Sequence, residues 1–480
     1  MSAASPAPAN PASPAPSTPR RVLGLRDLVF YYLVTGISLR WISFAAAGGA
    51  SVLLVWIGAW FAFALPLILS VLALSSRYPQ EGGLYLWSRI AFGEFGGFMA
   101  GWTYWTSNLP YFPTVLYFAA GSGIFLTGNY SALPPAAPVY FIAFSLAALL
   151  FITLLNVRGL ESGTWINNLG AAGMWIPILV LVGIAVALLR SSAPATHFSA
   201  ASLVPRASLQ DAIFWSAITF ALCGCEAASF MGDEIENPRR NVPRALLAGS
   251  LLSVLGYMIG TVAILLILPS RLVDSLEGLP QAVAAGAARL GISGVLAPVA
   301  LLIVVSNVGA ASAFLAACSR VPFVAGLDRY LPEAFGRLHP RFGTPHVSLW
   351  FQFAAAAVFV FLGQAGTSVE GAYNVLVSMT VITTFIPYLF LFASVVRLAP
   401  RLAESTQPAF FRLPGGPIVV SALALLGFAT TLVCILLSLV PSAAEPNKPL
   451  AVLKVAGLSF LLLAAGVAAY AGGIRHAHPA

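Results

Sequence analysis

The sequence predicts an all-α integral membrane protein with twelve transmembrane helices in a single bundle. Hydrophobic residues make up 59% of the 480-residue chain and charged residues only 8%, and the mean hydropathy is +0.89. An ordinary globular domain carries about 25% charged residues, so this chain cannot cover itself with a surface suited to water. Twelve apolar stretches reach the length of about 20 residues that a helix needs to cross a bilayer.

The chain begins with a polar tail and continues as closely spaced spans. Residues 1–20 are mostly Ala, Pro, Ser and Asn, which predicts a disordered cytoplasmic tail and not a signal peptide. We expect spans at residues 25–49, 52–76, 94–126, 138–156, 164–189, 211–233, 243–268, 294–325, 346–364, 370–396, 416–440 and 451–472. The first and third exceed one crossing, which predicts tilt or a break. Residues 269–293 are amphipathic, and we expect short helices there over the mouth of the bundle.

The basic residues predict the orientation of the spans. With the N-terminus in the cytoplasm, seventeen of the 24 Lys and Arg residues fall on the cytoplasmic side, six fall on the outer side, and Arg40 lies within the membrane. The positive-inside rule therefore predicts a multi-pass protein of the cell membrane with both termini in the cytoplasm. We interpret the net charge of +8 as belonging to these loops, and we expect no nucleic-acid partner.

Side chains of the types used in catalysis or metal binding are sparse in and beside the spans. The four cysteines lie in or beside spans and the five histidines lie in loops or the tail, so we expect neither a metal site nor a cofactor. No Ser/His/Asp set or phosphate-binding loop lies in or beside the spans, which disfavours an enzyme.

Two spans contain a glycine break near their middle. The first contains Thr35-Gly36 and the sixth contains Cys223-Gly224. Glycine destabilises a helix interior, and the two breaks lie five spans apart. Because five is odd, the two halves of the chain enter the membrane in opposite senses, which indicates an inverted repeat with a binding site at its interface. Alternatively, each glycine only lets helices pack closely.

The backbone at the two breaks predicts a zwitterionic ligand. The outer half of the first span and the inner half of the sixth each begin at a break, where free N–H groups and the helix dipole attract a carboxylate. The other two half-helices end there, and their free carbonyls can hold an ammonium group. An amino acid carries both groups.

Two charged residues stand beside these breaks. Glu226 is a lone acid within an apolar span, and such a carboxylate can take up and release protons near neutral pH; the alternative is a structural hydrogen-bonding acid. Arg40 stays charged and must find an anion or water. It pairs with Glu226, binds the side-chain carboxylate of an acidic substrate, or extends to the outer vestibule.

Polar residues in two further spans are candidates for lining the site. Asn108 in the third span is predicted to face a cavity, whereas the tryptophans around it suit core packing. Residues 306–309 in the eighth span read Ser-Asn-Val-Gly, which suits either an ion site for sodium or protons, or close packing against the first span.

Three motifs in the connections are similar to those of one transporter superfamily. Residues 79–87 follow a P-x-x-G-G-x-Y-x-W pattern, residues 232–243 read Gly-Asp-Glu-Ile-Glu-Asn-Pro-Arg-Arg-Asn-Val-Pro, and residues 326–332 read Gly-Leu-Asp-Arg-Tyr-Leu-Pro before His339-Pro340 and Thr344-Pro345. Together with the two breaks, these motifs resemble the amino acid–polyamine–organocation transporter superfamily over about residues 24–440.

The resemblance implies a LeuT-like fold and secondary active transport by alternating access. It implies a transporter domain at residues 21–472, with inverted repeats of five spans each at about 24–190 and 211–396, two extra helices at about 416–472, and a cytoplasmic tail at 473–480. The expected function is amino acid transport by proton-coupled symport or substrate exchange, and the alternative is a carrier of polyamines or other organic cations. Expected partners are a small-molecule substrate, protons or sodium, and the lipid bilayer, with the chain a monomer or homodimer.

The resemblance also assigns roles to residues. It places the first break on Val34, Thr35 and Gly36, an aromatic gate on Phe220, and proton-linked gating on Glu226. Some relatives carry a lysine in the fifth span, where this chain has Asn167 and Asn168, so the coupling mechanism stays open. The predicted substrate-binding residues are Val34, Thr35, Gly36, Ile37, Ser38, Arg40, Asn108, Phe220, Ala221, Cys223 and Gly224, and the predicted cytoplasmic gate network is Glu234, Glu236, Arg239 and Arg240, which alternatively form a solvated loop.

Overall fold

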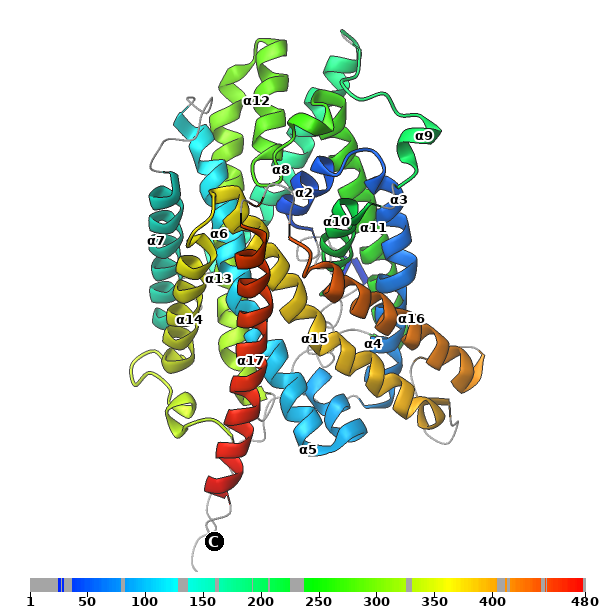
Figure 1. The fold of residues 1–480 in the computed structure, drawn as a ribbon, viewed down its shortest axis with the longest axis vertical. Coiled ribbons are helices and arrows are strands. Elements are labelled where there is room, and N and C mark those ends of the chain that lie inside the picture. The colour runs from blue at the N-terminus through cyan, green and yellow to red at the C-terminus, as the bar shows by residue number, and fades with distance from the viewer. Residues whose placement is uncertain are drawn as a thin grey trace, which may run out of the picture.

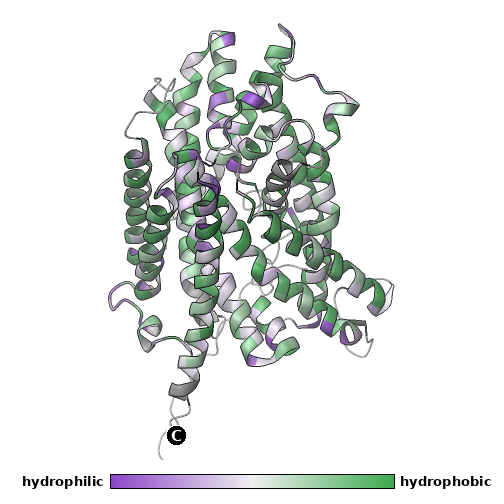
Figure 2. Cartoon of the chain, viewed as in Figure 1, coloured by the Kyte–Doolittle hydropathy of each residue, from purple (hydrophilic) through white to green (hydrophobic). Residues whose placement is uncertain are grey.

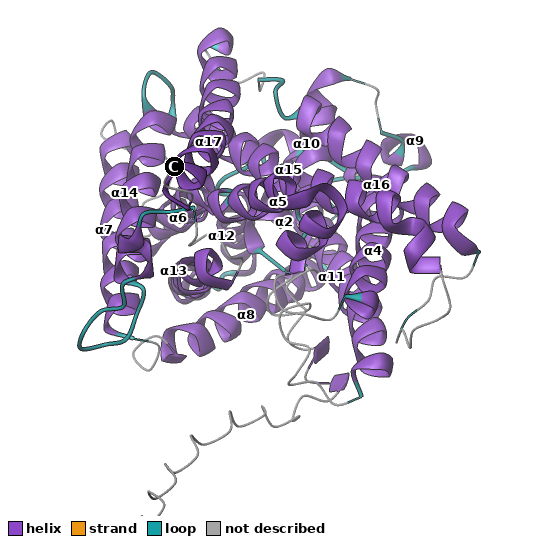
Figure 3. Cartoon of the chain, turned by 90° about the horizontal axis from the view of Figure 1, so that it is seen from below, coloured by secondary structure: helices purple, strands orange, loops and turns teal. Residues whose placement is uncertain are grey.

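A computed structural model gives the fold of the chain. It describes residues 25–26, 28–29, 37–78, 83–127, 137–159, 164–191, 193–205, 208–224, 237–324, 330–403, 411, 415–441, 445 and 447–477. Over these residues the chain forms helices and connections without strands (Figure 3). Within the same residues, nine helices are long and apolar enough to cross a membrane.

The nine long apolar helices agree with nine of the expected spans. They cover Val52–Arg77, Gly83–Thr127, Ala137–Arg158, Arg240–Ile267, Ser293–Ser319, His346–Gln364, Val369–Leu402, Gly416–Leu437 and Lys448–Gly473. A shorter apolar segment, Gly173–Leu189, belongs to α8 (Thr164–Leu189) at the expected fifth span. At the expected first and sixth spans the described residues form two short helices, α2 (Leu39–Ala47) and α10 (Leu209–Phe220).

The expected second and third spans contain irregular turns. In the second, a π-helical turn at Trp60–Ala64 joins α3 (Val52–Ala59) to α4 (Leu65–Arg77). In the third, α5 (Gly83–Thr106) begins eleven residues before the expected start at 94, because Gly93 adopts φ 80° and lets the helix kink and continue. A turn at Ser107 then leads into α6 (Asn108–Ile124). A break in the third span, one of the two alternatives expected there, is therefore confirmed. The expected start of that span at residue 94 was wrong.

A long helix runs obliquely through the middle of the bundle. This helix, α15 (Val369–Ala403), packs against α4, α5, α6, α16 (Gly416–Leu437) and α17 (Lys448–Ala477) (Figure 1). Green, which marks hydrophobic residues, covers most of the helical ribbon, and many of the hydrophilic residues lie near helix ends and connections (Figure 2). Ile418 of α16 is 81% exposed and Phe460 of α17 is 71% exposed. Such exposed apolar faces suit contact with lipid.

The remaining helices complete the bundle around α15. They are α7 (Ala137–Arg158), α9 (Ala200–Leu203), α11 (Pro238–Ile267), α13 (Leu296–Val324) and α14 (His346–Gln364). Helices α8 and α13 pack closely, because the absence of a side chain at Gly173 lets its backbone approach Leu302 and Ser306.

Short helices lie over α2 at one end of the bundle. Residues Ser270–Leu272 form a single turn, and α12 (Gly278–Leu290) packs against α2, α8, α11 and α13. The backbone N–H of Leu279 donates to Ser43 Oγ of α2 over 2.9 Å. Helix α12 lies at the upper end in Figure 1, and the C-terminus of the chain lies at the opposite end with α5. The expected short helices between residues 269 and 293 are thus present and adjoin α2.

Candidate functional site

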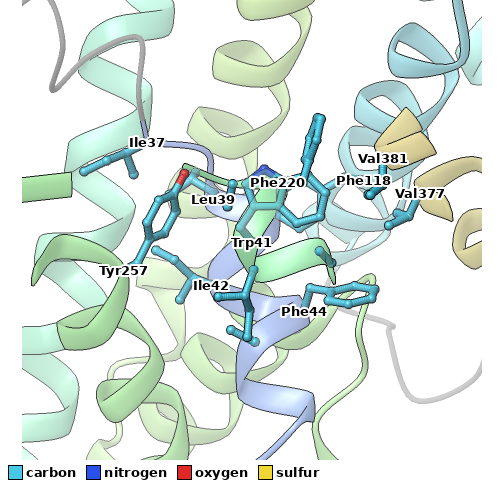
Figure 4. Close-up of a cluster of buried hydrophobic side chains, with 14 of the residues drawn as sticks. Ile37, Leu39, Trp41, Ile42, Phe44, Phe118, Phe220, Tyr257, Val377 and Val381 are labelled. Atoms are coloured by element: carbon cyan, nitrogen blue, oxygen red, sulfur yellow. The ribbon is translucent and has the colours of Figure 1, made fainter. Parts of the chain in front are cut away.

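The first turn of α2 and the last turn of α10 meet inside the bundle. Helix α2 begins at Leu39 after an extended Ser38 (φ −128°, ψ 125°), and α10 ends at Phe220. The rings of Trp41 and Phe220 pack edge to face with centroids 5.2 Å apart (Figure 4). Gly224 has φ 108°, a conformation that favours glycine, so the helix does not continue through it. Non-helical backbone therefore precedes α2 and follows α10, at the two helix ends that meet.

Two buried tyrosines hold the non-helical backbone in place. The N–H of Ser38 donates to Tyr257 Oη of α11 over 3.0 Å, and the N–H of Gly224 donates to Tyr388 Oη of α15 over 3.3 Å. The Tyr257 hydroxyl points toward the segment between Ile37 and Leu39 (Figure 4). A buried N–H outside a helix needs such an acceptor, so each hydroxyl replaces a lost helical hydrogen bond. Neither tyrosine was among the residues predicted from the sequence.

Glycines of α11 bring that helix close to α2. A Cβ at Gly256 would lie 2.9 Å from Ile37 Cδ1, and a Cβ at Gly260 would lie 2.8 Å from Ile42 Cδ1. Tyr257 between them stacks on Trp56 with centroids 4.5 Å apart. This close approach sets the distance at which the Tyr257 hydroxyl reaches Ser38.

Arg40 is a buried cation one residue inside the start of α2. It is 2% exposed. Its guanidinium carbon lies 4.4 Å from the ring centroid of Trp41 and 4.8 Å from that of Tyr111 on α6. Among the described residues, neither Nε nor Nη1 has a hydrogen-bond partner. The guanidinium does not reach the surface, which disfavours extension to an outer vestibule, and pairing with Glu226 falls outside the described residues.

The other predicted site residues have varied placements. Ala221 is buried and Cys223 is half-buried just after α10, and Cys223 forms no disulfide. Asn108 is 8% exposed, and its Nδ2 donates to the carbonyls of Tyr104 (3.1 Å) and Trp105 (3.3 Å) of the preceding turn. The Nδ2 group of Asn108 is therefore already bonded to carbonyls of its own chain segment.

Several predicted residues fall outside the described part of the chain. These are Val34, Thr35, Gly36, Glu226, Glu234 and Glu236, and the side chain of Arg239. Arg240 is exposed in the first turn of α11. Within the described residues, no group of three or more His, Cys, Asp or Glu side chains is placed to hold a metal.

The tryptophans of α5 and the polar residues Ser306 and Asn307 of α13 take part in packing. Trp102 and Trp105 form a cluster with Phe98 and Met99, as expected for core residues. Ser306 Oγ and Asn307 Nδ2 both donate to the carbonyl of Ile303 one turn earlier. Ser306 packs against Gly173 of α8, which is the expected fifth span, whereas the packing alternative named the first span.

Comparison with known proteins identifies the family. The profile of the amino acid permease family matches residues 24–461. The chain belongs to the amino acid permease family. The predicted resemblance is thereby confirmed, and the long apolar helices are those of a multi-pass membrane protein.

Known relatives of this permease are named as transporters and not as enzymes. An uncharacterized transporter of Legionella pneumophila is 28% identical over 437 residues, which are 89% of this chain and 92% of the relative. A serine/threonine exchanger of Bacillus subtilis is 26% identical over 299 residues, 61% of this chain and 65% of the relative. A probable agmatine/putrescine antiporter of Lactococcus lactis is 29% identical over 234 residues, 49% of each chain.

Proposed function

We propose that this permease is a secondary active transporter that carries an amino acid across the cell membrane by alternating access. In this proposal twelve spans form two inverted repeats of five, at about residues 24–190 and 211–396, followed by two extra helices at about 416–472. Both termini lie in the cytoplasm. The substrate binds where the first and sixth spans are interrupted.

The observation that carries this proposal is the contact between the first turn of α2 and the last turn of α10. A helix start offers free N–H groups and the positive end of its dipole, which favour a carboxylate. A helix end offers free carbonyls, which favour an ammonium group. The 5.2 Å contact of Trp41 with Phe220 brings one end of each kind together. Both groups of an amino acid would therefore find partners between α2 and α10.

The residues around this contact have separate roles in the proposal. Residues 34–38 and 220–224 supply backbone and small side chains to the substrate, and Phe220 closes over it as an aromatic gate. Glu226 accepts and releases the coupled proton or takes part in the gating of exchange. Glu234, Glu236, Arg239 and Arg240 form the latch on the cytoplasmic side.

A polyamine or another organic cation is the second candidate substrate. The relative in Lactococcus lactis, named a probable agmatine/putrescine antiporter, favours it. The buried charge of Arg40 opposes it, because two cations in a site with little water repel each other.

Uptake by the purified protein in liposomes tests the proposed function. Labelled amino acids and polyamines are offered one at a time, with and without an imposed proton gradient and with and without unlabelled substrate inside. We expect uptake of at least one amino acid, stimulated by the gradient or by internal substrate, above that of protein-free liposomes. Uptake of polyamines with no uptake of any amino acid would overturn the proposal in favour of the second candidate.

A further inference from the structure

Arg40 carries a positive charge that the described part of the chain does not neutralise. It is 2% exposed, and the one ion pair among the described residues joins Arg89 to Glu94. The Nε and Nη1 donors of Arg40 lack protein partners within that same part. A buried guanidinium cannot lose its proton, so it is stable only next to an anion or water. An anion that enters from outside the chain meets this requirement.

The two aromatic rings hold the guanidinium in place, and its Nε and Nη1 donate no hydrogen bond within the described residues. Trp41 and Tyr111 lie 4.4 Å and 4.8 Å from its central carbon, and they come from α2 and α6. Such contacts attract the charge through the ring faces and make no hydrogen bonds to the N–H groups. The N–H groups therefore stay available to a carboxylate, with which they form charge-assisted bonds.

The charge balance identifies which carboxylate of the substrate binds to Arg40. The start of α2 already suits the α-carboxylate of an amino acid, and the end of α10 suits its ammonium group. A zwitterion has no net charge and would add no anion for Arg40, whereas an amino acid with an acidic side chain brings one further negative charge. We propose that Arg40 binds the side-chain carboxylate of the substrate, so that this permease carries an acidic amino acid. This inference rests on the proposed function.

Three substrates distinguish binding of the side-chain carboxylate from binding of the α-carboxylate. Glutamate carries both carboxylates, glutamine carries only the α-carboxylate, and 4-aminobutyrate carries only the distal one. In proteoliposomes we expect the wild type to take up glutamate or aspartate with a kcat/KM at least about tenfold above that of the matching amide. Arg40→Gln is expected to reduce uptake of the acid at least about tenfold and to change uptake of the amide by less than about threefold.

A control variant and a second measurement test the interpretation. Arg271→Gln removes the same charge from an exposed position next to α2, and we expect it to leave the preference for the acid unchanged. Binding of each substrate to Arg40→Gln is also measured as a ligand-induced shift in thermal unfolding, and we expect this shift to fall for the acid and to stay unchanged for the amide. Because Arg40→Gln removes an uncompensated charge, the ligand-free variant is expected to unfold at a higher temperature than the wild type.

The outcomes separate this inference from the proposed function. Equal loss of acid and amide uptake in Arg40→Gln would mean that Arg40 binds the α-carboxylate or acts only structurally, and it would overturn the inference. Uptake of neutral amino acids without uptake of acidic ones would also overturn it and leave the proposed function standing. Failure to take up any amino acid by the folded protein would overturn both.

Discussion

Ser38 lies directly before α2 and Gly224 follows α10, and the backbone N–H of each bonds to a side chain of another helix. Tyr257 and Tyr388 accept these hydrogen atoms over 3.0 Å and 3.3 Å from α11 and α15. Each hydroxyl comes from a helix other than the one it supports. The shape of the two breaks therefore depends on how α11 and α15 sit against α2 and α10.

Removing either hydroxyl is expected to loosen its break. Tyr257→Phe and Tyr388→Phe each remove one part-buried hydrogen bond to the backbone, which costs about 0.5–1.5 kcal/mol in stability, and we expect kcat/KM for uptake to fall about tenfold. Tyr117→Phe is the matched control, because its buried hydroxyl donates to Gln364 Oε1 away from the breaks. Thermal unfolding and liposome uptake are measured on all three variants. Equal loss of uptake in Tyr117→Phe would contradict a special role of the breaks.

Sequence reasoning did not predict the residues that hold the non-helical backbone at Ser38 and Gly224. A glycine beside a polar residue inside an apolar span is a local signal; it predicted the first break at Thr35-Gly36, which lies outside the described residues, and the second at Cys223-Gly224, just after the end of α10. The tyrosine partners lie 219 and 164 residues away along the chain, so local patterns contain no information about them. Asn108 was expected to face a cavity, but whether an asparagine bonds to a ligand or to its own helix depends on its rotamer.

Helix α12 is joined to the bundle partly through an acid at its start. Glu277 packs against the backbone of Gly121 on α6, at the position where a Cβ would lie 3.2 Å from Glu277 Cγ. Its buried Oε1 has no hydrogen-bond partner in the described chain. Burial, and secondly the nearby Asp274, raise the pKa of Glu277 to about 7 from an ordinary value of 4.5. The other titratable group that faces it is Tyr140 of α7.

The sign of the pH effect follows from this raised pKa. Between pH 4.5 and about 7 the folded protein binds a proton at Glu277 that the unfolded chain has released, so stability falls as pH rises through this range. Full ionisation of Glu277 would cost about 3 kcal/mol. We expect amides of α12 to exchange faster at pH 8 than at pH 5, after correction for intrinsic rates.

A variant without the titratable group checks this assignment. Glu277→Gln is expected to remove most of the pH dependence of thermal unfolding and of exchange in α12, while Glu94→Gln at the exposed ion pair with Arg89 keeps it. A pH profile unchanged by Glu277→Gln would show that another group controls the attachment of α12.

Long apolar helices were the elements best predicted from the sequence, because hydropathy and length directly report the need to cross a bilayer. The helix start at Gly83 was missed because Pro79, Gly82 and Gly83 read as a connection. The π-helical turn at Trp60–Ala64 was also missed, although Pro66, which follows it, lacks the N–H that would bond to the Ala62 carbonyl. Its irregular backbone is supported by a distant side chain, since Thr430 of α16 donates to the Ala62 carbonyl over 3.1 Å.

The whole molecule can be understood as a scaffold of long helices around two short ones. Helix α2 packs against α10, α11 and α12, and α10 packs against α3, α15 and α16. The sequence could place the two glycines five spans apart, and the inverted repeat inferred from this odd offset stays a prediction. It could not predict the packing of Trp41 on Phe220, since that contact depends on the tertiary arrangement of the halves.

Cys223 permits a direct test of where the substrate binds. It is a half-buried thiol outside any disulfide, next to the end of α10. Replacing Cys225, Cys318 and Cys434 by alanine leaves Cys223 as the single reactive position, and a matched variant that keeps only Cys434, buried on α16, serves as the control. Both variants are first shown to take up the amino acid identified in liposomes.

The measurement is the rate at which a small thiol reagent modifies Cys223 with and without that amino acid. If the substrate occupies the space between α2 and α10, an amino acid at ten times its Kd is expected to slow modification of Cys223 about tenfold and to leave that of Cys434 unchanged. A rate of Cys223 modification that is the same with and without the transported amino acid would contradict a binding site at the paired breaks.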